Sequence, residues 1–192
     1  MATWVMRHYT RQGLWSLFLM CALPLHAWTM LLAFRDLSWV TDRTNAWDAV
    51  GVLSYGLVFA LVESLLLFVV MGLLGYLVSE RWEAERRIGV LSVIVLVLSL
   101  WAIVGQLFFL LDVRVPGAII GFLVHVPHPL RVLYVVIPVI VAATYLIPVG
   151  LVLRTERGKR WMGGLIDRLS LLALFYLVFD VAALIIVVVR NV

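Results

Sequence analysis

The sequence predicts an all-α protein: a polytopic transmembrane helical bundle of five spans, with a short re-entrant or interfacial segment before the fourth. First, 65% of the 192 residues are hydrophobic, whereas soluble domains are nearer 45–50% apolar. Second, long unbroken apolar runs differ from the alternating segments of about ten residues that build membrane barrels. Third, five runs reach the roughly 20 residues needed to cross about 30 Å of hydrocarbon, at 14–34, 50–78, 88–111, 132–153 and 169–189.

The connections between these runs are short, so residues 1–192 are expected to form a single transmembrane domain surrounded by the lipid bilayer. A net charge of +4 does not indicate a nucleic-acid partner here, because the arginines cluster at span ends, where they orient membrane proteins. Cys21 is the only cysteine and lies inside the first span, so no intrachain disulfide is expected.

The first span needs to be distinguished from a cleaved signal peptide, because Arg7 and Arg11 precede it and Pro24 lies within it. Signal peptides have a shorter apolar region and a small-x-small cleavage site. The run at 14–34 is long, and the residues before Trp28 lack that pattern. We expect a retained transmembrane helix.

Charge in the connections predicts orientation. With five spans, the N-terminal tail shares a side with the second and fourth connections, and these three segments hold ten of the fifteen Lys and Arg residues. Cytoplasmic segments are the ones enriched in Lys and Arg. The N-terminus is therefore predicted to be cytoplasmic and the C-terminus external, in a membrane of the bacterial inner (plasma) type.

The second and fourth connections carry further predictions. Residues 79–87 contain no Gly or Pro, and Glu83 can pair with Arg86 and Arg87 at i+3 and i+4 spacing. We expect the second and third spans to form a helical hairpin. In the fourth connection, 154–168, Trp161, Met162, Leu165 and Ile166 lie among basic residues, as in a short amphipathic stretch on an anionic leaflet, although a solvated basic loop fits equally well.

An apolar segment at 115–126 precedes the fourth span and is too short to cross the bilayer. It suits a re-entrant or interfacial position on the outer side. Gly117 and Gly121 form a small-xxx-small pair that would let another helix approach. A sixth span would require this segment to cross, and we keep that count as an alternative.

The residues most able to carry chemistry are ionisable groups deep in the spans. Glu63 and Asp180 fall within roughly 2 Å of their span midpoints, and His26 about 3 Å outward, at 1.5 Å per residue. Tyr176 lies one turn before Asp180 on the same helix face. An ionised group at this depth costs several kcal/mol, so each of these groups needs a neighbour or a function.

Three interpretations of this set stay open. His26, Glu63, Asp180 and Tyr176 could build a buried proton or cation site, could be hydrogen-bonded groups that hold helices together, or could face a partner subunit. Shared depth does not decide among them, because the rotation of each helix about its axis is unknown.

A weaker outer-side candidate is His125 with His128, in the sequence His-Val-Pro-His. Zinc sites use three or four ligands, and only Asp112 is near them in sequence, so no metal is expected. A c-type haem is excluded because no Cys-x-x-Cys-His motif occurs. A b-type haem would need His26 paired with His125 or with another subunit, and the cofactor, if any, is unidentified.

No nucleotide-binding or catalytic motif appears, so we expect no enzymatic activity. The leading hypothesis is a non-catalytic integral-membrane subunit or anchor of a larger membrane complex, with other membrane subunits as partners. The alternative is a proton- or cation-coupled transporter of a small solute that uses a midplane carboxylate. A third hypothesis, an embedded enzyme acting on lipid or quinone, has only the two outer histidines in its favour.

Overall fold

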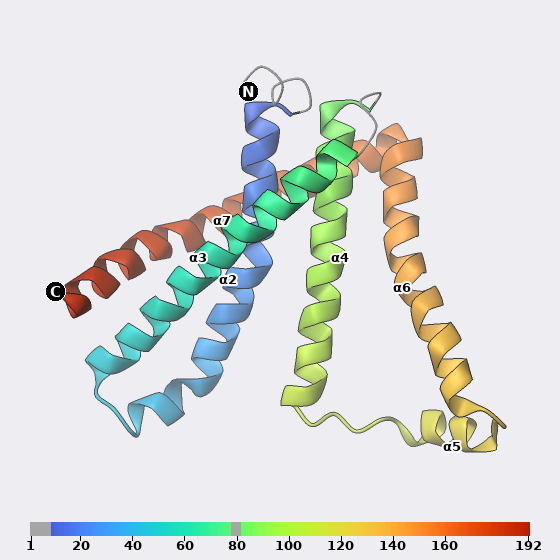
Figure 1. Ribbon diagram of the computed structural model, residues 1–192, viewed down its shortest axis with the longest axis horizontal. Helices are drawn as coiled ribbons and strands as arrows, with labels where there is room; N and C mark the ends of the chain where they lie inside the picture. The colour runs from blue at the N-terminus through green and yellow to red at the C-terminus, as the bar shows by residue number, and fades with distance from the viewer. Residues whose placement is uncertain (1–8, 78–81) are drawn as a thin grey trace.

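The computed structural model describes residues 9–77 and 82–192, and these fold into helices with no strand among them. Five helices are long and apolar enough to cross a membrane, and α5 is the short exception. The predicted class, a multi-pass helical membrane bundle, is confirmed. The helices (Figure 1) are α2 (Arg11–Thr41), α3 (Ala46–Leu77), α4 (Ala84–Leu110), α5 (Gly117–His125), α6 (Pro129–Arg154) and α7 (Glu156–Asn191).

The start of α7 corrects the predicted fourth connection. Helix α7 begins at Glu156, and Thr155 caps it by accepting a hydrogen bond from the Gly158 amide. A carboxylate in the first turn also complements the helix dipole. The predicted connection 154–168 is thus helical apart from Thr155. Its apolar residues Met162 and Ile166 are buried in the core beside α4, whereas Trp161 is exposed, and the position of this stretch on a leaflet stays a prediction.

The segment predicted to be re-entrant or interfacial forms α5, a helix of nine residues with none of them buried. Nine residues of helix span only about 14 Å, so α5 does not cross the bilayer and the count of five spans holds. Figure 1 shows α5 at the end of the molecule where α4 ends and α6 begins. Its re-entrant or interfacial position stays a prediction.

Successive long helices run in opposite directions. The end of α3, the start of α4 and the α6–α7 connection lie at the end of the molecule where α2 begins, and the α2–α3 turn and α5 lie at the other end (Figure 1). The last turn of α7 reaches that second end, because Arg190 donates to the Trp47 carbonyl at 2.6 Å and to Asp48 at 2.9 Å. Gly51 makes this contact possible, since a Cβ there would lie 2.6 Å from the guanidinium carbon.

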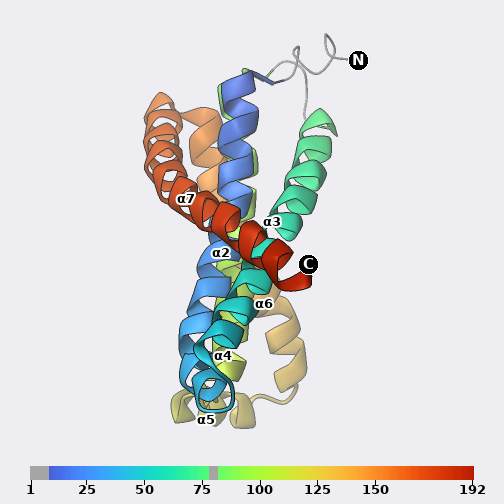
Figure 2. The ribbon, with the colours of Figure 1, turned by 90° about the vertical axis from the view of Figure 1, so that its left-hand side faces the viewer.

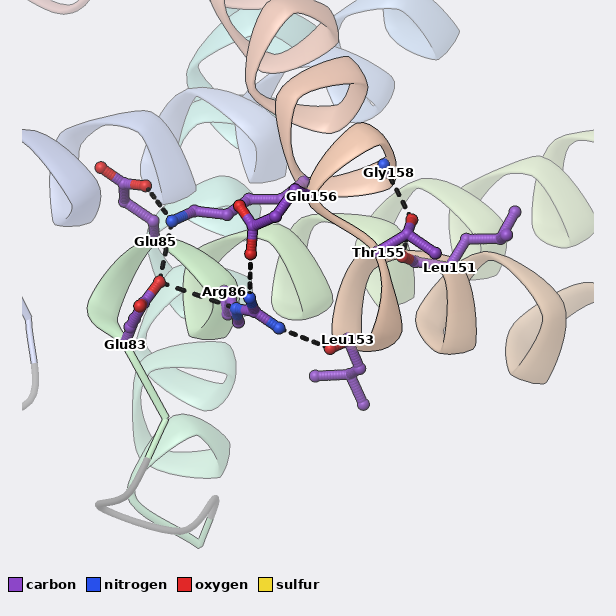
Figure 3. A network of polar contacts seen from close by, with 9 residues as sticks. Glu83, Glu85, Arg86, Leu151, Leu153, Thr155, Glu156 and Gly158 are labelled. Atoms are coloured by element: carbon purple, nitrogen blue, oxygen red, sulfur yellow. Dashed lines mark hydrogen bonds and ion pairs between the residues drawn. The ribbon is translucent and has the colours of Figure 1, made fainter.

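A polar network joins α4, α6 and α7 at the first of these ends (Figure 3). Arg86 donates to the Leu153 carbonyl at 2.5 Å and also pairs with the Glu156 carboxylate. Lys159 lies 2.8 Å from the carboxylates of both Glu83 and Glu85. Arg86 is therefore the residue that satisfies a free carbonyl in the last turn of α6 and holds the start of α7 beside it.

The predicted pairing of Glu83 with Arg86 is present at 3.6 Å, but Lys159 is the closer partner. Its hydrogen bond is the main reason that the pKa of the Glu83 carboxyl lies below its ordinary value of 4.5. Because the folded-state pKa is the lower one, this contribution to stability is complete above about pH 4.5 and is lost as the pH falls through the folded value. Glu83 is exposed, so solvent screens the effect.

Helix α2 is the centre of the packing. Its residues Leu17, Met20 and Cys21 are fully buried, and α3, α4 and α7 all pack against it. Tyr9, just before α2, donates its hydroxyl to the Gly72 carbonyl at 2.8 Å. That contact requires a glycine at Gly75, where a Cβ would lie 1.6 Å from the tyrosine oxygen. Figure 2 shows α7 crossing α2 near the middle of the molecule.

Labelling tests the predicted orientation. Asp42 and Glu83 lie at opposite ends of the bundle, so single cysteines introduced there should react with an impermeant maleimide from opposite faces of the membrane. Cys21 is fully buried, and Cys21→Ala supplies an unreactive background. Labelling of both positions from one face would contradict the five-span arrangement.

Candidate functional site

The structure brings His26 of α2 and Asp180 of α7 into direct contact. The imidazole Nε2 lies 3.0 Å from Oδ1 and 2.9 Å from Oδ2 of the carboxyl group. The other ring nitrogen, Nδ1, lies 2.8 Å from the Ala22 carbonyl oxygen one turn earlier in α2. His26 is 0% exposed and Asp180 is 2% exposed. Two residues 154 positions apart in the sequence thus form one buried polar pair.

Small residues on α7 let it approach α2 closely enough for this contact. Ala173 and Ala183 are buried with Asp180, at spacings of seven and three residues that place all three on one helix face. On α2, Ala22 and Leu23 are buried around the histidine. Close approach through small residues is the usual way in which membrane helices associate.

The contacts determine how many protons the pair holds. A carbonyl oxygen only accepts hydrogen bonds, so Nδ1 must carry a proton that it donates to Ala22. A second proton must lie between Nε2 and the Asp180 carboxyl, because two lone pairs would otherwise face each other. Whether this proton belongs to the histidine or to the aspartic acid, the pair has no net charge. A neutral pair with its ring donor satisfied is tolerable in hydrocarbon.

Tyr176 belongs to the same cluster, but it contacts the His26 ring, whereas its spacing of four residues on α7 suggested a bond to Asp180. Its ring stacks on the His26 imidazole, with centroids 5.9 Å apart and planes inclined by 23°. Among the described residues no hydrogen bond joins Tyr176 to Asp180. Tyr176 therefore contributes a flat apolar face that covers the imidazole.

Glu63 is separate from this cluster. It lies on an exposed position of α3, whereas the neighbouring Ser64 is fully buried. Glu63 lines a cavity of about 660 Å³ between α2 and α3 that does not include His26 or Asp180. In the described part of the chain, no hydrogen bond or ion pair reaches its carboxylate. Their similar depth thus predicted that His26, Glu63 and Asp180 could lie together, but in the structure only His26 and Asp180 are in contact.

The outer histidines lie at the end of α5 and just before α6. His125 closes the last turn of α5, where its Nδ1 lies 2.6 Å from the Gly121 carbonyl oxygen. His128 is the residue that precedes α6. Across residues 9–77 and 82–192, no group of three or more His, Cys, Asp and Glu side chains could hold a metal ion.

Arg190 makes an interhelical contact that the sequence analysis does not predict. It links α7 to the start of α3 through Asp48 at 2.9 Å. Asn191 adds a hydrogen bond to the Tyr55 hydroxyl at 2.5 Å. The available signal was the acidic first turn of α3, which offers a partner to any basic residue at the same end of the bundle.

Comparison of the chain with protein-family models, with curated proteins and with solved structures finds no match. The geometry described above therefore carries the functional argument.

Substitution of Asp180 tests the neutral pair. In Asp180→Asn the amide can donate to Nε2 of a neutral His26, so we expect a loss of about 1 kcal/mol or less in the free energy of unfolding. Asp180→Leu has a similar shape but leaves Nε2 without a partner, so we expect a loss of roughly 1–3 kcal/mol. Unfolding in one lipid or detergent measures both variants, and equal losses would count against the neutral pair.

Proposed function

We propose that this chain is a non-catalytic integral-membrane subunit of a larger membrane protein complex. The observation that carries the proposal is the amount of surface that the helices leave uncovered. The chain exposes 13083 Å², whereas a folded soluble monomer of 21.7 kDa exposes about 9,200 Å². Five long helices that bury so little against one another have extensive faces available for other subunits as well as for lipid.

Helix α6 illustrates this shortage of internal packing. Val152 is its single buried residue, and farther along the helix Thr144 accepts a hydrogen bond from the Trp101 indole of α4 at 3.0 Å. Large apolar side chains along the rest of α6, such as Tyr134 and Leu146, are exposed. Lipid can cover such apolar side chains. They therefore support the proposal only together with Glu63, a polar group that lipid cannot satisfy.

The His26–Asp180 pair supports a structural role for the buried polar residues. Both side chains are enclosed, and the Nδ1 donor and the shared proton are already bonded. A site that transports protons or ions needs access from water, and a catalytic site needs room for a substrate. The pair has neither, and its position at the crossing of α2 and α7 suits a contact that holds two helices together.

The transporter alternative has one observation in its favour. The cavity of about 660 Å³ beside Glu63 is large enough for a small solute, and its carboxylate could take up a proton. In that case Glu63→Gln should abolish transport while the fold stays intact, because an amide cannot titrate.

We further propose that the complex lies in a bacterial inner membrane with the N-terminus of this chain in the cytoplasm. The support is the distribution of charge, since ten of fifteen basic residues fall in the N-terminal tail and the second and fourth connections.

Gentle extraction separates these proposals. From membranes of its own host, the tagged chain should co-purify with non-identical membrane proteins in fixed stoichiometry, measured by native mass spectrometry. A monomer or homo-oligomer that transports a solute in liposomes would refute the subunit proposal. The Glu63→Gln variant of that preparation then serves as its matched control.

A further inference from the structure

A groove runs along α2 and α3 from their connecting turn to Glu63. Its α3 wall includes Ala49, Gly56, Ala60 and Glu63, whose spacings of seven, four and three residues place them on one face of the helix. Thr29 and Ala33 are part of the α2 wall. From Ala46, at its open end, to Glu63 the groove extends roughly 25 Å along α3, from the connecting turn to the middle of the predicted span.

The groove is apolar apart from two carboxylates and the hydroxyl groups of Thr29 and Thr41. Asp36, near the turn, is already paired with Arg35 at 2.7 Å. Glu63, at the deep end, has no such partner among the described residues. An ionisable group in the bilayer interior is tolerated when it pairs with another polar group or lines a water-filled cavity. The groove is lined mainly by Ala, Leu, Val and Phe, and no cationic side chain from residues 9–77 or 82–192 lines it, so a charged partner for Glu63 would come with the molecule that occupies the groove.

A second copy of this chain cannot supply that group. None of its predicted spans contains Lys or Arg, because all fifteen basic residues lie outside the five apolar runs. The histidine within a span, His26, is bonded to Asp180 and fully buried. The cationic partner of Glu63 therefore comes from a different molecule.

The shape of the groove indicates what kind of molecule this is. Small residues line much of its wall, and α2 and α3 are so close at Gly56 that a Cβ there would lie 3.3 Å from Thr29 Cγ2. Walls of this kind admit a third helix at short distance. We infer that a transmembrane helix of a non-identical subunit lies in this groove and places a Lys or Arg side chain against Glu63.

This inference rests on the proposed subunit function and adds the docking face and the chemistry of the partner. The groove lining includes neither His26 nor Asp180, and Ala33 lies two turns beyond His26 on α2, so the docking face can be altered without replacing either residue of the pair.

Site-specific photocrosslinking in host membranes tests the inference. A photoreactive residue replaces Phe59, which lines the groove and is 67% exposed. The matched control replaces Val69, which lies on another face of α3 and is 54% exposed. Phe59 should capture a non-identical membrane protein, and the crosslinked peptide should belong to a transmembrane segment that contains Lys or Arg. Val69 should not yield this peptide.

Two substitutions separate charge from shape. Glu63→Gln should lower the yield of that crosslink at least about tenfold, because it leaves the partner's cation unpaired. Ala33→Phe fills the groove without altering the charge and should lower the yield similarly. Glu63→Lys, combined with a change of the partner's basic residue to Glu, should restore it.

Adducts with lipid alone, crosslinks between two copies of this chain, or a captured peptide without Lys or Arg would overturn the inference. So would an unchanged yield in Glu63→Gln. If subunits still co-purify in fixed stoichiometry while any of these results is found, the subunit proposal stands and only the docking site is wrong. If Glu63→Gln fails to fold, the identity of the peptide captured by the Phe59 position decides alone.

Discussion

A single proton between His26 and Asp180 is the constraint on which the arrangement of the helices depends. Because Nδ1 of His26 donates to the Ala22 carbonyl, only a proton between Nε2 and the carboxyl group can make the contact attractive. The pair is then neutral and can be enclosed in hydrocarbon. Its geometry requires α7 to cross α2 at that depth. Small residues of α7 on the same face make the close crossing possible, and Arg190 and Arg86 fix the two ends of α7 against α3 and against α4.

The two carboxylates of the membrane interior have opposite surroundings, and this contrast organises the functional account. Asp180 has its partner within the chain and is closed to solvent and lipid. Glu63 lies on an exposed face beside a groove and has no partner in the described part of the chain. One carboxylate thus contributes to the fold itself. The other is costly in hydrocarbon when it is ionised and unpaired, and a cation supplied by another molecule would offset that cost.

The spans could be predicted because crossing hydrocarbon fixes the length and polarity of a helix, which the sequence displays directly. The depth of His26 and Asp180 followed from the same counting. Depth alone also grouped Glu63 with them, and this failed because the rotation of α3 about its axis depends on contacts such as Tyr9 with Gly72 and Arg190 with Asp48. The early start of α7 could not be read from hydrophobicity, because residues 156–168 are rich in charge, and it depends on the Thr155 cap.

The coupling between His26 and Asp180 tests the central claim most directly. A double-mutant cycle compares the free energies of unfolding of His26→Leu, Asp180→Leu and the double variant in one lipid composition. If the two residues share a proton, each single variant leaves the other polar group unsatisfied, so the double variant should be more stable than the sum of the single losses by about 1 kcal/mol or more. Additive losses would contradict the claim that this pair holds α2 to α7.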